Sequence, residues 1–274
     1  MLRSWLMDDA RRVLGMPTAA DDKYSRGVVG LRTGSRHFPG AAVLGVEGAW
    51  RTGIGMVRYL GPSRPTRLVL ARRPETVTAD GRVQAWVIGS GTSAEDRTDA
   101  ETQALRTILG GSDPVIVDAG ALDLAVSATA PIVVTPHAGE HARLRSALGL
   151  DPDTARSPSS AAETAAALGG VVLLKGATTI VASPEGGECA IEAPTSWLAT
   201  AGTGDVLAGI LGAVTASAAG RGASVSLAAC AATAAWLHGQ AAQAASDAVG
   251  GGPITALDVA EHLPAVVGRV LTAP

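Results

Sequence analysis

Residues 200–209 read TAGTGDVLAG, in which three glycines surround one aspartate, Asp205. The residues after this aspartate are mostly apolar, so we predict a helix that begins near Asp205 and runs into the interior. A helix N-terminus offers unpaired N–H groups and the positive end of a dipole, and glycines let the backbone close around a phosphate. The turn formed by Gly202, Thr203 and Gly204 is therefore a candidate anion-binding site at the start of this helix.

Asp205 itself has two interpretations. An aspartate near the start of a helix often serves only to cap it. Alternatively, a carboxylate on a buried approach could stay ionised through the helix dipole and act as a general base toward a hydroxyl group beside a bound phosphate. These ten residues alone leave both interpretations open.

Composition narrows the class of protein. The 274 residues are 47% hydrophobic, which suits one large α/β domain over 1–274, with about 1–20 as an N-terminal extension. A net charge of −3 and an aromatic content of 3% give no reason to expect a nucleic-acid partner or an acidic membrane surface. Ala, Gly, Thr and Ser after Asp205 indicate a buried helix rather than a membrane span. Cys189 and Cys230 form no C-x-x-C pair, so we expect a reducing compartment, the cytoplasm.

Apolar runs of strand length alternate with Ala-rich stretches of helical length. Repetition of strand and helix predicts a mostly parallel sheet with helices on its faces. SPEGG (183–187) predicts a hairpin turn, and 151–160 a surface loop. The predicted strands are 67–71, 85–89, 114–120, 131–136 and 171–176, and the predicted helices are 41–50, 94–109, 159–168 and stretches from Gly204 to the end.

Residues that directly follow these strands are candidates for chemistry, because ligands bind at the carboxyl ends of parallel strands. The rule selects 89–92 (GSGT), 118–120 (DAG), 135–140 (TPHAGE) and 175–179 (KGATT). Lys175 stands out among them, because the chain has only two lysines, Lys23 and Lys175.

Two motif matches have plainer explanations. GSGTSA (89–94) fits the dinucleotide fingerprint G-x-G-x-x-A, but it comes late in the chain, and a Gly-rich turn explains it equally. HAGEH (137–141) spells a zinc-protease pattern, yet Pro136 and Gly139 indicate that His137 lies in a turn before a helix. The sequence contains no G-x-x-x-x-G-K-[ST] and no G-x-S-x-G, so P-loop ATPases and α/β-hydrolases are excluded.

TAGTGDVLAGILGAV resembles the signature of ribokinase-like phosphotransferases, and further motifs narrow the resemblance to the ADP- or ATP-dependent NAD(P)H-hydrate dehydratases. Each motif is modest alone, but six in order are specific. The resemblance implies a ribokinase-like three-layer α/β/α fold with a central, mostly parallel sheet. It covers 22–57, 89–93, 117–124, 135–144, 173–186, 235–245 and 254–264.

The resemblance also implies a reaction. Hydrated NADH or NADPH (NADHX or NADPHX) is phosphorylated on its ring hydroxyl by ADP or ATP, and phosphate is then eliminated. Asp205 would deprotonate the hydroxyl, while Gly202, Thr203 and Gly204 would hold the transferring phosphoryl group. The hydrated dinucleotide would contact Ala41, Gly91, His137 and Asp205, and the adenine nucleotide would contact Lys175, Gly176, Ala177, Thr178, Thr179 and Gly204.

Mg²⁺ is expected to bridge the nucleotide phosphates, without dedicated protein ligands. Glu140 is a weaker candidate ligand, and it is equally explained as a first-turn charge. His137 is open to interpretation as a helix cap or core histidine, and Ala41 as a helix-packing position. The family's tetramers imply a homo-oligomer, with no nucleic-acid or membrane partner.

Some features depart from the family's pattern. Ser90 and Ala138 stand where the family often has proline, although neither change removes a functional group. The N-terminal segment is too short for the epimerase domain fused to many relatives, so we expect either a separate epimerase or a fragment of a longer chain.

An alternative function is phosphorylation of a vitamin precursor, as in hydroxyethylthiazole kinase. The base, the anion-binding turn and the nucleotide would be unchanged, but such kinases usually carry asparagine where this chain has His137. A non-enzymatic adenylate-binding protein is a third possibility. The presence of Asp205 argues against it, because nucleotide binding alone requires no base.

Overall fold

The computed structural model describes residues 2–152 and 157–273. Within them the strands form one nine-stranded sheet in the order β1-β9-β8-β7-β6-β5-β4-β2-β3. β8 is antiparallel to β7 and β9, and the other neighbours are parallel, so the predicted mostly parallel sheet is confirmed. The strands are β1 (Arg3–Ser4), β2 (Val28–Arg32), β3 (Met56–Tyr59), β4 (Ala85–Ile88), β5 (Val115–Val117), β6 (Ile132–Val134), β7 (Val171–Leu174), β8 (Thr178–Ala182) and β9 (Glu188–Glu192).

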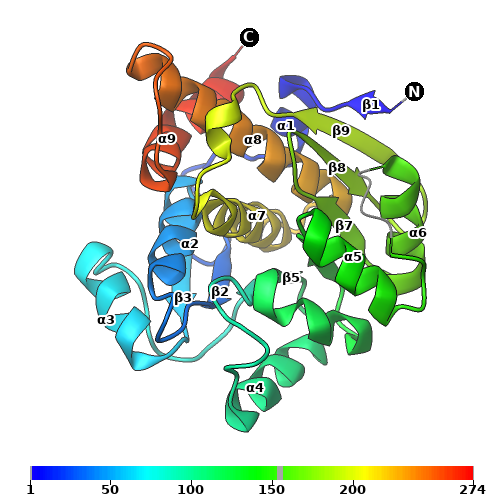
Figure 1. Ribbon diagram of the computed structural model, residues 1–274. Coiled ribbons are helices and arrows are strands. Elements are labelled where there is room, and N and C mark those ends of the chain that lie inside the picture. Colours follow the sequence, from blue (N-terminus) through cyan, green and yellow to red (C-terminus); the bar gives the residue numbers. More distant parts are fainter. Residues whose placement is uncertain (1, 153–156, 274) are drawn as a thin grey trace.

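Helices cover both faces of the sheet, as Figure 1 shows. One layer contains α1 (Met7–Val13), α2 (Gly40–Arg51), α7 (Thr203–Gly220), α8 (Leu227–Ala248) and α9 (Ala256–Thr272). The other contains α4 (Asp99–Leu109), the 3₁₀ segment η1 (Ala119–Ser127), α5 (Ala138–Ala147) and α6 (Pro158–Leu168). α3 (Ser63–Arg72) packs beside α2, and the short 3₁₀ turn η2 (Ser196–Leu198) precedes α7.

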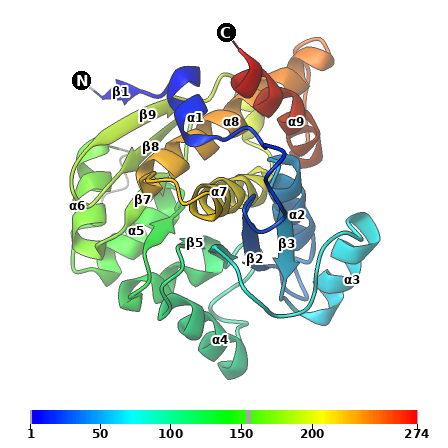
Figure 2. The same cartoon turned by 180° about the vertical axis from the view of Figure 1, so that it is seen from behind.

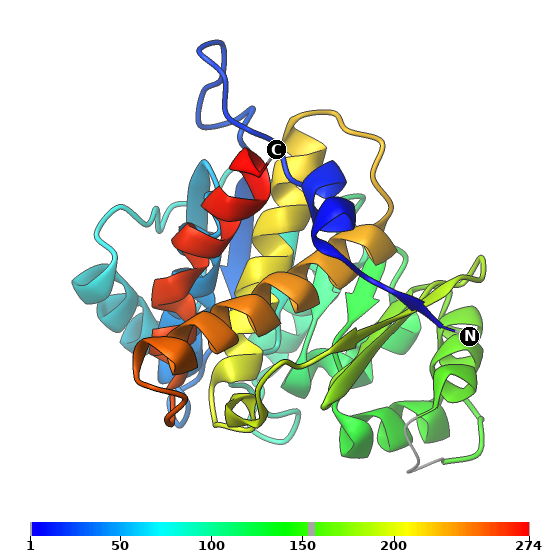
Figure 3. The same ribbon diagram turned by 90° about the horizontal axis from the view of Figure 1, so that it is seen from above.

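Alternation along the central strands produces the two cores. Val115 and Val117 face the layer of α4 to α6, whereas Ile116 between them faces the layer of α7 and α8. Successive side chains of a strand point to opposite faces, so one fully buried strand contributes to both layers. Figure 3 shows α7, α8 and α9, in yellow, orange and red, side by side over one face.

α7 is the central helix of the molecule and lies between α2 and α8. Its 18 residues have a mean hydropathy of 1.2, so the helix is long and apolar enough to cross a membrane. However, 72% of the helix is buried inside the fold. The interior takes up its apolar surface on nearly all sides. The expected buried helix is confirmed, and its first turn lies at the carboxyl edge of the sheet.

Several boundaries differ from the sequence-based prediction. Residues 67–71 are not a strand but the second half of α3, where Val69 is buried and its neighbours Leu68 and Leu70 are 44% and 36% exposed. The predicted helix 94–109 begins only after the cap at Thr98, whose hydroxyl accepts from the Glu101 N–H. Of the predicted loop 151–160, residues 153–156 lie outside the described residues, and 158–160 open α6.

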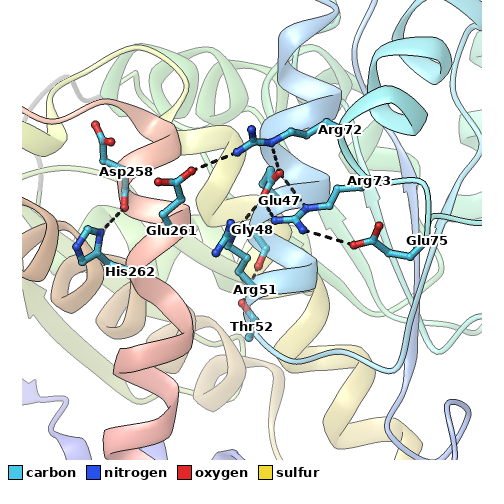
Figure 4. A network of polar contacts seen from close by, with 10 residues as sticks. All are labelled: Glu47, Gly48, Arg51, Thr52, Arg72, Arg73, Glu75, Asp258, Glu261 and His262. Atoms are coloured by element: carbon cyan, nitrogen blue, oxygen red, sulfur yellow. Dashed lines mark hydrogen bonds and ion pairs between the residues drawn. The ribbon is translucent and has the colours of Figure 1, made fainter.

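A charged cluster fastens α2 to its neighbours α3 and α9 (Figure 4). The Glu47 side chain is fully buried, and its carboxylate accepts hydrogen bonds from Arg51, Arg72 and Arg73 at 3.1, 2.7 and 2.5 Å. Arg72 also reaches Glu261 of α9 at 3.2 Å. Burial alone raises the pKa of Glu47, but the three guanidinium groups outweigh it and lower the pKa, so the carboxylate stays charged.

The N-terminal segment is part of this fold. β1 pairs in parallel with β9, with Arg3 opposite Cys189, and α1 packs on α8 and α9. Figure 2 shows β1 lying along β9 at the edge of the sheet. The Asp9 carboxylate accepts hydrogen bonds from both Arg3 and Arg12, which ties the strand to the helix that follows it.

Candidate active site

Four neighbouring parallel strands, β4 to β7, end at one edge of the sheet and bring four polar side chains together. Asp118, which follows β5, is only 3% exposed. Its carboxylate accepts from the Ser90 hydroxyl at 2.8 Å, the Thr135 hydroxyl at 2.7 Å and the Lys175 ammonium at 3.0 Å. Polar side chains therefore gather at the carboxyl ends of these strands, in a network centred on Asp118.

The residue after Asp118 has an unusual backbone conformation. Ala119 has a φ of 43°, the one positive φ at a non-glycine position among the described residues. A side chain in this region is strained, and such strain gathers where the surrounding structure fixes it for function. It turns the chain sharply after β5, with Asp118 held at the strand end.

Lys175 lies between the Asp118 network and the start of α7. Its Nζ is 3.9 Å from Glu140 Oε2, and a Cβ placed on Gly204 would lie 3.6 Å from it. Burial lowers the pKa of Lys175, but the charges of Asp118, Glu140 and Asp205 raise it overall. The ammonium therefore stays protonated and faces the turn that was predicted to bind an anion.

The start of α7 has the geometry of an anion-binding turn. Gly202 is the N-cap in the left-handed region, with φ 90°, and a Cβ there would lie 2.5 Å from Leu44 Cδ1. No side chain caps this helix, whereas the Thr203 hydroxyl donates away from it to the carbonyls of Leu198 and Thr200, both at 2.9 Å. First-turn N–H groups have no partner inside a helix, so those of Gly204 and Asp205 are available to an anion.

Asp205 occupies the third helical position of α7. Burial raises its pKa, the charge of Asp118 raises it further and Lys175 opposes both, with a result of about 7. The carboxyl therefore titrates near neutral pH, above the range in which the helix dipole alone would keep it. A pKa near the working pH suits a general base, because the group can both take up and release a proton.

A cavity of about 800 Å³ opens beside this turn. Most of the residues that the resemblance assigned to nucleotide or phosphoryl binding line it, together with His137. Thr178 does not line it but stands exposed at the start of β8, and Asp205 and Gly202 lie next to the lining residues rather than among them. The predicted residues on its wall are His137, Lys175, Gly176, Ala177, Thr179, Thr203 and Gly204.

Ala41 and Gly91 meet on the other side of α7. Gly91 has a φ of 64°, and a Cβ there would lie 2.3 Å from the Ala41 Cβ, so the close approach requires glycine. Ala41 is 6% exposed near the start of α2, whose Leu44 lies against Gly202. These two positions are thus joined to each other and to the anion-binding turn, but not to the cavity that His137 lines.

His137 is the N-cap of α5, so the capping interpretation is confirmed. Its Nδ1 accepts from the N–H groups of Gly139 and Glu140 at 3.0 and 3.3 Å, and Glu140 Oε2 accepts from the His137 N–H at 2.8 Å. The imidazole is exposed at the cavity, whereas His141 is buried against Thr164, with 2.8 Å between Nε2 and Oγ1. HAGEH therefore does not gather its histidines as a zinc site would.

A second cavity, of about 590 Å³, lies at the ends of β4 and β5. Glu140 lines it together with Thr92, Gly120 and Arg143. Lys175 lines the first cavity and stands 3.9 Å from Glu140, so this pair separates the two spaces. There is thus one cavity on each side of the Lys175–Glu140 pair.

Mg²⁺ fits this edge of the sheet only where nucleotide phosphates supply part of its coordination shell. Within residues 2–152 and 157–273, no cluster of three or more His, Cys, Asp or Glu side chains could hold a metal ion. Mg²⁺ commonly needs one or two carboxylates and completes its shell with nucleotide phosphates and water. Glu140, with its side chain 11% exposed between the two cavities, could supply one such carboxylate.

Sequence reasoning placed Asp118 at a strand end but assigned it no role. Its position directly after the fully buried strand β5 could have indicated a role at the site, because the same kind of position selected Lys175 after β7. The hydroxyl of Ser90, at a position where proline is common in the family, is a second contributor whose role shows only in the folded chain.

Comparison with known proteins identifies the family of this chain. The family model for NAD(P)H-hydrate dehydratase matches residues 29–265. A bifunctional NAD(P)H-hydrate repair enzyme of Mycobacterium tuberculosis is 44% identical over 214 residues, which are 74% of this chain and 43% of that protein. The chain thus spans less than half the length of that relative.

Two further proteins match most of their own length. An ADP-dependent (S)-NAD(P)H-hydrate dehydratase of Neisseria meningitidis is 35% identical over 83% of this chain and 80% of that protein. The crystal structure of the Bacillus subtilis ADP/ATP-dependent NAD(P)H-hydrate dehydratase, co-crystallised with ATP and Mg²⁺, has a TM-score of 0.84 and 28% identity, and covers 98% of this chain and 99% of that one. The ribokinase-like three-layer fold is thereby confirmed, and the chain belongs to the NAD(P)H-hydrate dehydratase family.

Proposed function

We propose that the chain is an ADP-dependent (S)-NAD(P)H-hydrate dehydratase, a hydro-lyase that returns hydrated NADH and NADPH to their reduced forms. The observation that carries the proposal is the place of Asp205, whose partly buried carboxyl has a pKa raised to about 7 and follows the anion-binding turn directly. A capping aspartate would have its pKa lowered by the helix, so the raised value favours the general base.

The chemistry needs a base beside a phosphoryl group. Asp205 takes the proton of the hydroxyl at C6 of the nicotinamide ring, and that oxygen bonds to the terminal phosphorus of ADP while the bond to AMP breaks. The C6–O bond then breaks, its electron pair leaves with phosphate, and the ring nitrogen supplies electrons. Loss of a proton from C5 restores the reduced ring. Phosphorylation thus converts a poor leaving group into a good one.

Donors at the carboxyl edge can stabilise the charge of the transferring phosphoryl group. The first-turn N–H groups of Gly204 and Asp205 and the ammonium of Lys175 converge there from two elements. Phosphoryl transfer depends mainly on positioning and on such fixed positive charge. Mg²⁺ would neutralise phosphate charge, with Glu140 as the carboxylate best placed to hold it.

In the proposed reaction two ligands approach Asp205 from opposite sides of α7. We assign the adenine nucleotide to the 800 Å³ cavity, which Lys175 and Gly204 line. The hydrated dinucleotide is assigned to the side of Ala41 and Gly91, from which its ring can approach Asp205. The family match does not favour a vitamin-precursor kinase, although the base and the anion-binding turn would serve one equally.

Assembly and compartment belong to the same proposal. We expect a homotetramer in the cytoplasm, and two features support the reducing compartment: Cys189 and Cys230 are both free, and both are buried. Size-exclusion chromatography with light scattering tests the tetramer, and a monomeric mass would contradict it.

Recovery of NADH absorbance tests the activity. The purified chain is incubated with hydrated NADH, Mg²⁺ and either ADP, ATP or no nucleotide. We expect recovery with ADP and none without nucleotide. Stable phosphorylation of a vitamin alcohol, without any action on hydrated NADH, would favour the kinase instead.

Asp205→Asn isolates the base. The substitution keeps size and hydrogen bonding but removes proton uptake, so we expect nucleotide binding to persist while turnover falls by about 10³-fold or more. Asp99→Asn, in the exposed first turn of α4, is the matched control and should keep wild-type turnover. Wild-type turnover in Asp205→Asn would refute the assigned role.

A further inference from the structure

The cavity of about 590 Å³ at the ends of β4 and β5 has no ligand in the proposed reaction. Its lining combines polar side chains with apolar ones such as Leu122 and Leu144, which are 6% and 3% exposed. An apolar wall with a few polar groups is the usual form of a small-molecule site. The cavity therefore has the character of a binding site.

The loop after β4 connects this cavity with the position assigned to the hydrated ring. Gly91 in this loop approaches Ala41, and the next residue, Thr92, lines the cavity. On its other side, the Lys175–Glu140 pair separates the cavity from the one assigned to ADP. A dinucleotide whose ring lies beside Gly91 can thus extend its other half into the cavity without competing with ADP.

Arg143 of α5 is the basic residue on the wall of this cavity, and its charge has no partner. Its side chain forms no hydrogen bond or ion pair with any residue in 2–152 or 157–273. Nearby arginines are engaged: Arg97 donates to both carboxylate oxygens of Asp123, at 2.9 and 2.5 Å, and Arg145 donates to Glu163 at 3.0 Å. The N–H donors of Arg143 are therefore all available to a ligand.

The guanidinium group of Arg143 lies over the start of α5. A Cβ placed on Gly139 would lie 4.0 Å from Arg143 Nη1 and 3.2 Å from His137 Cε1. Side chains of a helix lean toward its N-terminus, and residues four apart share a face, which explains this position. Arg143 thus adds its charge to the positive end of the helix that His137, a predicted contact of the hydrated dinucleotide, caps.

The carboxylates around the cavity leave the charge of Arg143 unmatched. Asp123 is already paired, and Glu140 lies 3.9 Å from Lys175. Glu95 is exposed to solvent and forms no ion pair within the described part of the chain. A guanidinium group binds phosphate oxygens through two parallel N–H donors, and the apolar wall beside it suits a base or a ribose.

We propose that this cavity receives the adenosine half of the hydrated dinucleotide and that Arg143 binds a phosphate group of that half. This inference rests on the proposed function. The phosphate is either the pyrophosphate, common to both substrates, or the 2′-phosphate that hydrated NADPH alone carries. Arg143 does not line the cavity of Lys175 and Gly204, where the phosphoryl group transfers, so its contact affects KM for the dinucleotide rather than kcat.

Arg143→Gln tests the contact, because it removes the charge from an exposed side chain. We expect KM for the hydrated dinucleotide to rise about 10- to 100-fold, while kcat and KM for ADP stay within about threefold. A rise for hydrated NADPH alone identifies the 2′-phosphate, and an equal rise for both substrates identifies the pyrophosphate. Arg143→Lys keeps the charge without the paired donors and should give an intermediate KM.

Arg106→Gln is the matched control, because Arg106 is an exposed arginine of α4 that has no partner among the described residues and does not line the cavity. Its KM values should equal those of wild type. Ala147→Phe tests the cavity itself, since the larger side chain occupies the space of the ligand. It should raise KM for the dinucleotide, whereas Ser146→Phe, at the preceding exposed position of α5 outside the lining, should not.

Fluorescence titration of the AMP-saturated protein with NADH and NADPH measures the same contact without turnover. In Arg143→Gln we expect the affinity for at least one of them to fall by a factor similar to the rise in KM. The proposal is overturned if KM for both hydrated substrates stays within about twofold of wild type, or if KM for ADP rises and Tm falls in parallel. A wild-type chain inactive on hydrated NADH contradicts the proposed function, whereas an active one beside unaffected Arg143 variants contradicts only this inference.

Discussion

The carboxyls of Asp118 and Asp205 influence each other across the start of α7, and this coupling predicts a pH profile. Burial and the charge of Asp118 bring the pKa of Asp205 to about 7, so turnover should rise with pH through that value as the base loses its proton. Asp118→Asn removes one of the two causes. We expect the acidic limb of kcat to move down by roughly one pH unit.

The profile of kcat against pH between 5 and 9 checks this expectation. Asp80→Asn, an exposed change of the same charge, is the control and should leave the limb in place. An active Asp118→Asn with an unmoved limb would show that burial alone sets the pKa of Asp205. Because Asp118 also anchors Lys175, KM for ADP is expected to rise in the same variant.

At the residue scale, local patterns could select part of the candidate site. The turn from Gly202 to Asp205 and Lys175 at the end of β7 could be selected from the sequence, because glycine content and strand ends are local features. Asp118 could not be given a role in that way. Its partners Ser90, Thr135 and Lys175 come from three other strands, and only the order of strands in the sheet brings them within 3.0 Å.

At the scale of elements, α2 is held by the cluster around Glu47, and this predicts a stability difference. Glu47→Gln leaves three guanidinium groups around a neutral amide. The arginine side chains that carry these groups are 22% to 42% exposed. Because water can solvate those groups in part, we expect a loss of about 2 kcal/mol in the free energy of unfolding, below the range for a fully buried pair.

Urea unfolding measures this loss, and the same network contains its control. Glu261 also pairs with Arg72, but its side chain is 47% exposed, so Glu261→Gln should cost no more than about 0.5 kcal/mol. Equal costs for the two variants would mean that burial of Glu47 contributes nothing.

Element prediction failed where a short apolar run has no neighbours to define it. Residues 67–71 (RLVLA) form a short apolar run of strand length with β-branched Val69, yet they lie in the second half of α3, whose first turn carries Pro65. β2 and β3 were missed because one contains Gly30 and the other has four residues with Arg58 among them. Their strand conformation comes from pairing with each other and with β4, which no local pattern shows.

For the whole molecule, the raised pKa of the Asp205 carboxyl lowers the free energy of unfolding at neutral and higher pH. The pKa of Asp205 is about 7 when folded and 3.8 as the reference value, so between these values the folded chain holds a proton that the unfolded chain has lost. The unfolded state binds fewer protons there, and the contribution of Asp205 to the free energy of unfolding falls as pH rises through this window.

Asp205→Asn removes this dependence. We expect its Tm to exceed that of wild type by roughly 3–6 °C at pH 8, and by much less at pH 5, where the wild-type carboxyl is protonated when folded. Thermal unfolding followed by circular dichroism at both values provides the comparison. A Tm difference that is the same at pH 5 and pH 8 would contradict the raised pKa.

The pairing of β1 with β9 sets an order of assembly. Arg3 lies opposite Cys189 in that ladder, so its formation closes a loop that contains most of the chain. Closing so long a loop costs chain entropy before a two-residue strand returns any contact energy, and the ribosome delivers β9 long after β1. During synthesis the N-terminal strand must therefore wait, unpaired, until the hairpin of β8 and β9 has emerged, and its docking is one of the last folding steps.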